Sequence, residues 1–170
     1  MNRKSVIKHI IAEAKGNPIL AEQYALQDTL SPIIKEMRAL IETAKGRLKT
    51  IKSLAMKVES GKLGRDSLED VKKIWLECNH VFTKLFEHRN TIAKHLQAAY
   101  ENEAAPMELA KEIISVSYRH ISNAQALSRR AFKHCCSESA DSTIEDAELC
   151  EMDLDKLSES LYKITKGMLY

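Results

Sequence analysis

The sequence has little of what interrupts helices or forms turns. Its 170 residues include only 5 glycines and 3 prolines. A β-sandwich or barrel needs many turns and would use more of both, and a disordered chain would be richer in them. Aromatic residues make up 5% of the chain, which suits seams of aliphatic side chains better than a thick mixed core. No apolar run approaches the roughly 18 residues of a membrane span, so we predict no membrane partner.

The first residues also lack the pattern of an export signal. Lys8 and His9 interrupt the apolar stretch near the start, so we expect no signal peptide. The four cysteines are then expected to be reduced thiols in the cytoplasm. These cysteines are Cys78, Cys135, Cys136 and Cys150.

The strongest pattern in the sequence is helical periodicity. Apolar residues recur at alternating steps of three and four, which is the seam of a packed helix, and no segment alternates as a strand does. The pattern predicts an all-α fold in one domain spanning residues 1–170. We expect an elongated bundle of two short and four long helices with antiparallel, coiled-coil-like packing. The short helices are expected over residues 3–15 and 18–30, and the long ones over about 32–59, 67–100, 106–135 and 143–168.

Local signals predict where two of the long helices begin. Ser31 followed by Pro32 predicts the start of the first one, because serine caps helices and proline suits their first turn. Ser142 with Glu145 forms a capping box that predicts the start of the last one, after a polar linker over residues 137–142.

Each long helix carries a seam that we expect to face its neighbours. The first seam is Leu30, Ile34, Met37, Ile41, Ala44, Leu48, Ile51, Ala55 and Val58. The second is Val71, Ile74, Cys78, Val81, Leu85, His88, Ile92, His95 and Ala99, widened by Trp75, Phe82 and Leu96. The third is Ala110, Ile113, Ile114, Ser117, Ile121, Ala124, Leu127 and Ala131. The last is Ala147, Cys150, Leu154, Leu157, Leu161, Ile164 and Met168.

Charge is unevenly spread, although the net charge is only +2. Residues 1–65 hold 13 Lys and Arg against 6 Asp and Glu, and residues 137–170 hold 3 against 9. Basic residues flank the seam of residues 32–59 and acidic residues flank that of residues 143–168, so we predict that these two helices are paired neighbours. The alternative is that the basic side chains bind nucleic-acid phosphates. The candidate phosphate-binding residues are Arg38, Lys45, Lys49 and Lys52.

The sharpest local motif lies between Glu87 and His95. It contains Arg89, the polar residue Asn90, and a histidine six positions after the arginine. This motif, about ten residues of the chain, resembles the signature of the HEPN superfamily. The resemblance implies a small all-α bundle. It also implies, as in many members, a metal-independent ribonuclease of a toxin or anti-phage defence system, with a site that forms across a dimer.

By that resemblance, His95 would move the proton when the 2′-hydroxyl of RNA attacks the adjacent phosphate, because histidine titrates near neutrality. Arg89 would hold the phosphate with its forked donors, and Asn90 would position the groups. Six positions along a straight helix place Arg89 and His95 about 120° apart. A shared site would therefore need a bulge in the helix or the copy in a partner subunit. The other interpretation is structural, with His95 in a packed seam and Arg89 on the solvated surface.

Metal ligation has only fragmentary candidates. Glu77 and His80 form one Glu-x-x-His pair, but a di-iron bundle needs a second pair and further carboxylates. His134 and the two cysteines that follow it could supply zinc ligands with Cys78 and His80, yet the chain has no Cys-x-x-Cys pair. A Gly-rich phosphate loop and a Gly-x-Ser-x-Gly elbow are also missing. We therefore predict no metal and no cofactor.

Two classes of function remain. We expect a non-catalytic helical bundle that acts by binding, such as a small subunit, an inhibitor or a chaperone-like protein. Its expected partner is a second copy of the chain or a helical protein, because the helices carry more apolar seam than four of them can cover. The alternative is the HEPN-like ribonuclease, with RNA as its partner.

Overall fold

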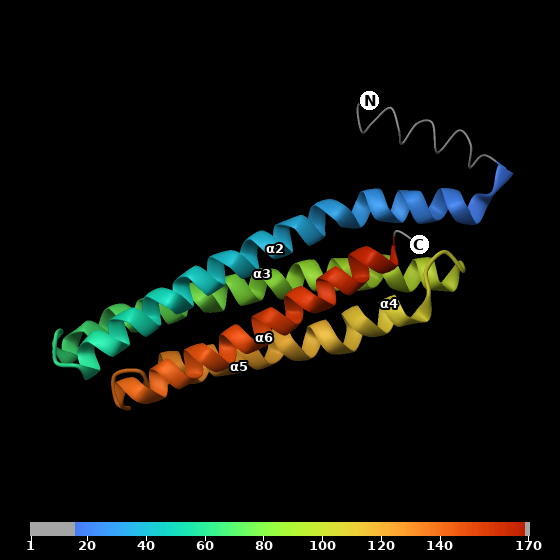
Figure 1. Cartoon of the computed structure of the whole chain (residues 1–170). Helices are drawn as coiled ribbons and strands as arrows, with labels where there is room; N and C mark the ends of the chain where they lie inside the picture. Colours follow the sequence, from blue (N-terminus) through green and yellow to red (C-terminus); the bar gives the residue numbers. More distant parts are fainter. Residues whose placement is uncertain (1–15, 169–170) are drawn as a thin grey trace, which may run out of the picture.

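The computed structural model describes residues 16–168, and this part of the chain is helical without a β-strand. Figure 1 shows an elongated bundle in which the chain reverses its direction at each connection between long helical segments. The helices are α2 Pro18–Glu59, α3 Leu68–Glu101, α4 Met107–Lys111, α5 Tyr118–His134 and α6 Ala140–Gly167. A 3₁₀ turn, η2 Arg65–Ser67, precedes α3, and a π-helical segment, η3 Glu112–Ser117, joins α4 to α5 without a break.

The four long helical segments pack in a ring. α2 contacts α3 and α6, and α5 contacts the same two helices. The all-α prediction is confirmed. Of the six helices predicted for the chain, five fall within residues 16–168, and this part of the chain forms four long helical segments instead. The helix predicted over residues 3–15 lies outside the described residues. Among the helices of residues 16–168, none has both the length and the apolar character that crossing a membrane requires.

Residues 18–30 and 32–59 form one helix, α2, instead of the predicted two. The helix begins after Asn17, whose side chain accepts a hydrogen bond from the Leu20 amide at 3.3 Å. Ser31 does not cap a helix, because its hydroxyl donates to the carbonyl oxygen four residues earlier, at 2.7 Å. The predicted start at Ser31 is therefore wrong.

Pro32 lies inside α2 because burial outweighs its cost. A proline in a helix interior costs about 3 kcal/mol, since its nitrogen carries no hydrogen to donate. Leu30 and Ile34, two residues to either side, are only 0% and 2% exposed. Fully burying one such side chain is worth about 1.5–3 kcal/mol. Both stay in the core only if the helix continues, and Pro32 itself faces solvent.

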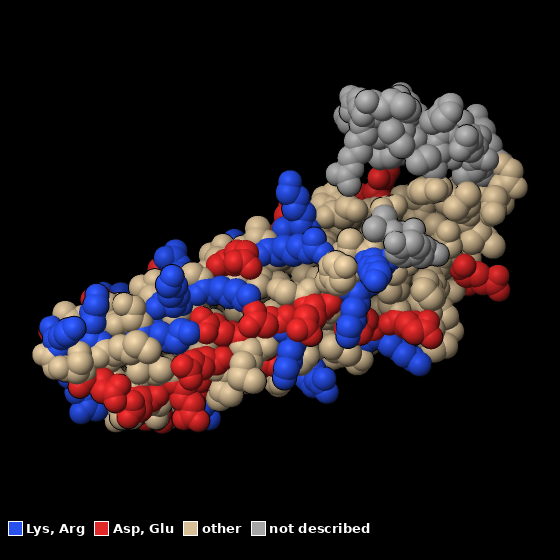
Figure 2. All heavy atoms as spheres, viewed as in Figure 1, with Lys and Arg blue, Asp and Glu red and all other residues tan. Residues whose placement is uncertain are grey.

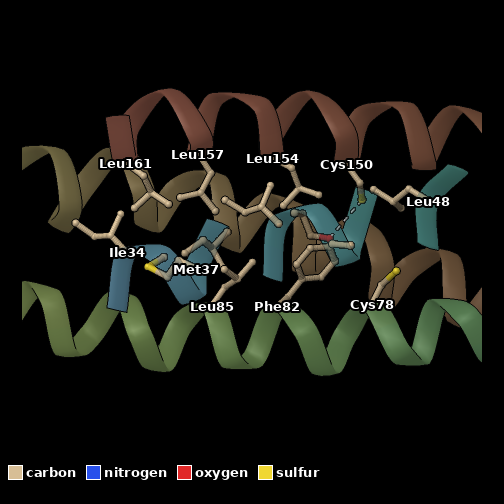
Figure 3. Close-up of a cluster of buried hydrophobic side chains, with 14 of the residues drawn as sticks. Ile34, Met37, Leu48, Cys78, Phe82, Leu85, Cys150, Leu154, Leu157 and Leu161 are labelled. Carbon is tan, nitrogen blue, oxygen red and sulfur yellow. Dashed lines mark hydrogen bonds between the residues drawn. The ribbon is translucent and has the colours of Figure 1, made fainter. Parts of the chain in front are cut away.

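The seams of α2 and α6 lie in the core as predicted. Every predicted seam residue of α2 is buried except Val58, which is half-buried, and the same holds for α6 with Met168 as the exception. Figure 3 shows these side chains pointing between the helices toward those of α3. The residues that meet there include Ile34, Met37 and Leu48 of α2, Phe82 and Leu85 of α3, and Leu154, Leu157 and Leu161 of α6.

α3 is rotated relative to the predicted seam. Trp75 and Phe82, predicted only to widen the seam, are fully buried, whereas the predicted seam residue His95 is exposed. The reason is size, because each aromatic side chain buries about 150–250 Å², more than the aliphatic residues beside it. Rotating α3 toward these rings also brings Arg89 to a core-facing position.

The third predicted helix, residues 106–135, is α4, η3 and α5 in succession. Within it, Ile114 was predicted to lie in the seam and is instead exposed. In a π-helical turn the backbone hydrogen bonds reach the fifth residue instead of the fourth. The wider turn shifts the side chains around the helix axis, so Ile113 and Ser117 are buried and Ile114 is not.

α6 begins at Ala140, three residues earlier than predicted. The N-cap is Ser139, whose hydroxyl accepts a hydrogen bond from the Ser142 amide at 3.3 Å. Ser142 thus lies in the first turn, and the predicted capping box and the end of the predicted linker are wrong. The early start places both Ala140 and Thr143 in the core.

Candidate binding site around Arg89

Arg89 occupies a core-facing position of α3. Leu85 and Ile92, four residues before it and three residues after it, are both fully buried. A charged group at such a position must find hydrogen-bond acceptors, because an unpaired buried charge costs several kcal/mol. Arg89 is half-buried, and this burial lowers the pKa of its guanidinium. The group still carries its charge, since arginine does not lose its proton in proteins.

The acceptors come from the π-helical segment η3. Nε of Arg89 donates to the carbonyl oxygen of Ile113 at 3.0 Å, and Nη2 donates to that of Ile114 at 2.8 Å. Because the hydrogen-bond register of the backbone changes in a π-helical turn, carbonyl groups there can accept from a side chain. Arg89 and η3 therefore stabilise each other: the guanidinium supplies donors, and the widened turn supplies acceptors.

The aromatic ring of Tyr118 lies against the guanidinium of Arg89. The Cζ atom of Arg89 lies 5.1 Å from the ring centre of Tyr118, which is a cation–π contact. Phe86 meets the same ring edge-on, with the ring centres 5.5 Å apart and the planes at 62°. Ile114 and Tyr118 are 41% and 49% exposed. We call Phe86, Arg89, Ile114 and Tyr118 the Tyr118 patch.

Two of the three motif residues contact each other within the chain. Oδ1 of Asn90 accepts a hydrogen bond from Nη1 of Arg89 at 2.7 Å. His95 is exposed, and its position lies about 120° around α3 from that of Arg89. Three of the five guanidinium N–H donors are engaged, two of them by backbone carbonyls. A site completed by a second subunit stays a prediction.

The basic residues of α2 lie beside the acidic residues of α6. Nζ of Lys52 is 2.5 Å from Oε2 of Glu151, and Lys45 forms an ion pair with Asp155. The Asp155 carboxylate raises the pKa of Lys45. Figure 2 shows Lys and Arg side chains along α2 next to Asp and Glu side chains along α6. The predicted pairing of these two helices is confirmed.

The other two candidate phosphate-binding residues, Arg38 and Lys49, lie on the same helix, α2. Nη2 of Arg38 donates to the hydroxyl of Thr165 on α6, at 3.2 Å. Lys49 is exposed. Three of the four basic side chains thus contact residues of α6, and phosphate binding by this set stays a prediction.

The cysteines are buried or half-buried thiols without a disulfide. Burial raises the pKa of Cys78 to about 12, and that of Cys136, whose thiol donates to Glu69 at 3.1 Å, to about 11. Burial likewise raises the pKa of Cys135 and Cys150. Such thiols hold little thiolate, which is the form that attacks electrophiles and binds metals. Within residues 16–168, no three His, Cys, Asp or Glu side chains are grouped to hold a metal ion.

Comparisons with known proteins place no relative beside this chain. No protein-family model, no curated protein and no solved structure matches it. Its function must therefore be argued from its own residues.

Sequence reasoning missed Tyr118, Phe86 and the exposure of Ile114. A signal for the wider turn was present, because three successive steps of four residues replace the usual alternation of three and four. The buried residues at these steps are Leu109, Ile113, Ser117 and Ile121. No comparable signal marked Tyr118, since a single aromatic residue on a helix is as common at the surface as at a site.

Proposed function

We propose that the chain is a non-catalytic helical bundle, with antiparallel and coiled-coil-like seams, that binds a helical protein through the Tyr118 patch. The observation that carries the proposal is the half-exposed ring of Tyr118, held against Arg89 and Phe86. Tyrosine and arginine are the residue types that most often dominate protein interfaces. Because the ring and the guanidinium already contact each other, binding a partner would immobilise little that is free.

The charge distribution favours a protein over RNA as the partner. Affinity for nucleic acid comes from several cations that can each neutralise a phosphate. On α2, Lys45 and Lys52 already share their charge with carboxylates of α6. The Tyr118 patch contains only one cation, Arg89, beside three apolar or aromatic side chains. That composition suits a protein surface better than a phosphate backbone.

The HEPN-like ribonuclease is the alternative. Under that hypothesis Arg89 must hold a phosphate, yet three of its donors are engaged inside the chain. His95 would have to come from a second subunit, because it lies on another side of α3. Asn90 beside Arg89 is the one contact that the motif would require and that the chain contains.

A second copy of the chain is the partner that can be tested first. Sedimentation equilibrium of the full chain would compare the wild type with Tyr118→Ser and Tyr162→Ser. Tyr162 lies on α6 and is 61% exposed, so its replacement removes the same side chain from a different surface. We expect the wild type to dimerise, Tyr118→Ser to weaken dimerisation by at least about tenfold, and Tyr162→Ser to leave it unchanged. A monomeric wild type at high micromolar concentration, or equal effects of both variants, would count against the proposal.

RNA cleavage by the wild type and by His95→Ala tests the alternative. Because His95 is exposed, its replacement should leave the fold intact. Identical behaviour of the two proteins would remove the ribonuclease hypothesis. Cleavage that is lost in His95→Ala would replace the binding proposal by the enzyme.

A further inference from the structure

The contact between α3 and α5 continues along the bundle beyond the Tyr118 patch. Nε2 of Gln125 on α5 donates to the Thr83 hydroxyl of α3 at 3.4 Å. Farther from the patch, Nζ of Lys72 on α3 lies 5.4 Å from the ring centre of Phe132 on α5. We call the surface along these contacts, from Lys72 and Phe132 to the ring of Tyr118, the α3/α5 face.

A second exposed apolar side chain lies on the α3/α5 face. Leu76 is 44% exposed, and it is four residues after Lys72 and seven before Thr83, which keeps it on the same side of α3. Ten residues of α3 separate it from Phe86 of the Tyr118 patch, which is about 15 Å of helix. Apolar contact points about three helical turns apart suit a partner helix, whose own apolar residues recur along one side.

The charge next to these apolar residues comes from α5. Residues 118–134 contain four Arg or Lys and no Asp or Glu. Arg130 forms an ion pair with Asp146 of α6. The other three basic residues are exposed, and within residues 16–168 they form no ion pair. These residues are Arg119, Arg129 and Lys133.

These three basic residues border the α3/α5 face. Arg129 is four residues after Gln125, which contacts α3, so it lies on the α3 side of α5. Arg119 and Lys133 each follow directly after an aromatic residue of the face. Residues 69–94 of α3 add little net charge, because they hold five Lys or Arg against four Asp or Glu. A partner that complements the face should therefore carry acidic residues over α5.

We propose that the partner of the Tyr118 patch is an acidic amphipathic helix of another protein, and that it lies along the α3/α5 face. Its apolar side would contact Leu76 and Tyr118, and its Asp and Glu residues would face the three basic residues of α5. Charged residues beside an apolar seam select the partner helix in coiled coils. This inference rests on the proposed function and adds to it the chemistry of the partner. Self-association through the same patch would compete with this helix.

The rings of the face favour an acidic helix over single-stranded RNA. Proteins bind RNA strands by stacking bases on aromatic rings, with cations along the backbone. The guanidinium of Arg89 lies over the ring of Tyr118, and Nζ of Lys72 lies over that of Phe132. Leu76, the other exposed contact point, is aliphatic and offers no ring for stacking. The surface thus suits aliphatic and acidic side chains better than bases.

Fluorescence anisotropy with labelled synthetic peptides tests the proposal on the full chain. Both peptides would be helices of about three heptads with leucine at the seam positions, flanked by glutamate in one peptide and by lysine in the other. We expect the chain to bind the glutamate peptide at least about tenfold more tightly than the lysine peptide at low salt. Molar salt should reduce the difference, because it screens exposed charges beyond about 3 Å.

Charge-reversed variants locate the contact. In Arg129→Glu/Lys133→Glu, the affinity for the glutamate peptide should fall at least about tenfold, because two attractions become repulsions. The control Lys35→Glu/Lys57→Glu makes the same change of charge on α2, across the ring of helices from α5. Its affinity should stay within about twofold of the wild type, since charges on that side are screened from the face. All four residues are exposed, so both variants should keep the helical circular dichroism spectrum.

Other results would overturn the proposal. Equal binding of the two peptides, or no binding of either, shows that the face does not select an acidic helix. Equal losses in the two double variants assign the effect to overall charge. Binding of a labelled uridine oligonucleotide but not of the glutamate peptide assigns the face to RNA. The proposed function is judged separately, by the effect of Tyr118→Ser on dimerisation, so the Tyr118 patch can remain a binding surface when the acidic partner is wrong.

Discussion

Replacing Arg89 by alanine should destabilise the bundle more than any substitution of an exposed α3 residue. The guanidinium donates to the carbonyl oxygens of Ile113 and Ile114 and stacks on the ring of Tyr118. Alanine can make none of these contacts. The α3 position itself faces the core, so the substitution also leaves a space where the side chain had been.

The expected loss can be estimated contact by contact. Ile113 is fully buried, so loss of the guanidinium donor to its carbonyl oxygen should cost about 1–3 kcal/mol. Ile114 is exposed, and water can replace the guanidinium there at little cost. The cation–π contact adds about 0.5–1 kcal/mol. Arg89→Ala should therefore lower the free energy of unfolding by about 2–4 kcal/mol.

The variant Arg89→Leu separates the effect of losing the hydrogen bonds from the effect of burying a side chain at this position. Leucine loses the same hydrogen bonds but places an apolar side chain between Leu85 and Ile92, where burial is worth about 1.5–3 kcal/mol. The leucine variant should thus be more stable than the alanine variant by about 1–3 kcal/mol. This order follows only if Arg89 faces the core.

Urea unfolding followed by circular dichroism measures these differences. The transition midpoint of Arg89→Ala should fall by about 1–2 M with an unchanged denaturant slope. His95→Ala, exposed on the same helix, is the control and should change stability by no more than about 0.5 kcal/mol. The reasoning is refuted if Arg89→Ala is no less stable than His95→Ala, or if Arg89→Leu is no more stable than Arg89→Ala.

Three further predictions concern other parts of the bundle. Pro32→Ala should restore a helical hydrogen bond and raise the free energy of unfolding by about 1–3 kcal/mol, seen as a higher thermal midpoint. A double-mutant cycle with Lys52→Ala and Glu151→Ala should give a coupling of about 0.2–1 kcal/mol that molar salt abolishes; a coupling that persists would show that screening does not reach the pair. Because burial and Glu69 raise the pKa of Cys136 to about 11, its alkylation rate should keep rising up to that pH, whereas an ordinary thiol levels off near pH 8.5; mass spectrometry would detect an early plateau.

The seams of α2 and α6 were predictable because one signal dominated each helix. Aliphatic residues at steps of three and four left a single face that could be buried. Charges of opposite sign next to the two seams then indicated which helices would be neighbours. The ion pairs between Lys52 and Glu151 and between Lys45 and Asp155 follow from that pattern.

The buried face of α3 was not predictable in the same way, because two apolar stripes overlap in its sequence. The choice between them depends on how large side chains fit between three other helices, which no local rule evaluates. Trp75 and Phe82 decided the rotation, since they have the most apolar surface to bury. The rejected stripe contains Ile74, Val81, His88 and His95.

Pro32 and Ser142 show why helix ends were the least predictable feature. The predicted helix starts at Pro32 and at Ser142 both rested on local preferences. A capping residue contributes about 1 kcal/mol, and a proline inside a helix costs about 3 kcal/mol. Burial of several side chains per turn exceeds those energies. The helix therefore continues through Pro32 and begins before Ser142, as the core requires.

The position of Arg89 in the seam also changes how the HEPN-like motif should be weighed. Within this fold Arg89 has a structural role, because its guanidinium donates hydrogen bonds to carbonyl oxygens of η3. Asn90 also has a structural role, because its side chain accepts a hydrogen bond from Arg89. A helical bundle with no nuclease activity would therefore retain both residues for stability. His95 is exposed, and its packing within residues 16–168 does not require a histidine there. Of the three motif residues, only His95 can distinguish an enzyme from a binding protein, which is why its replacement, and not that of Arg89, is the test of catalysis.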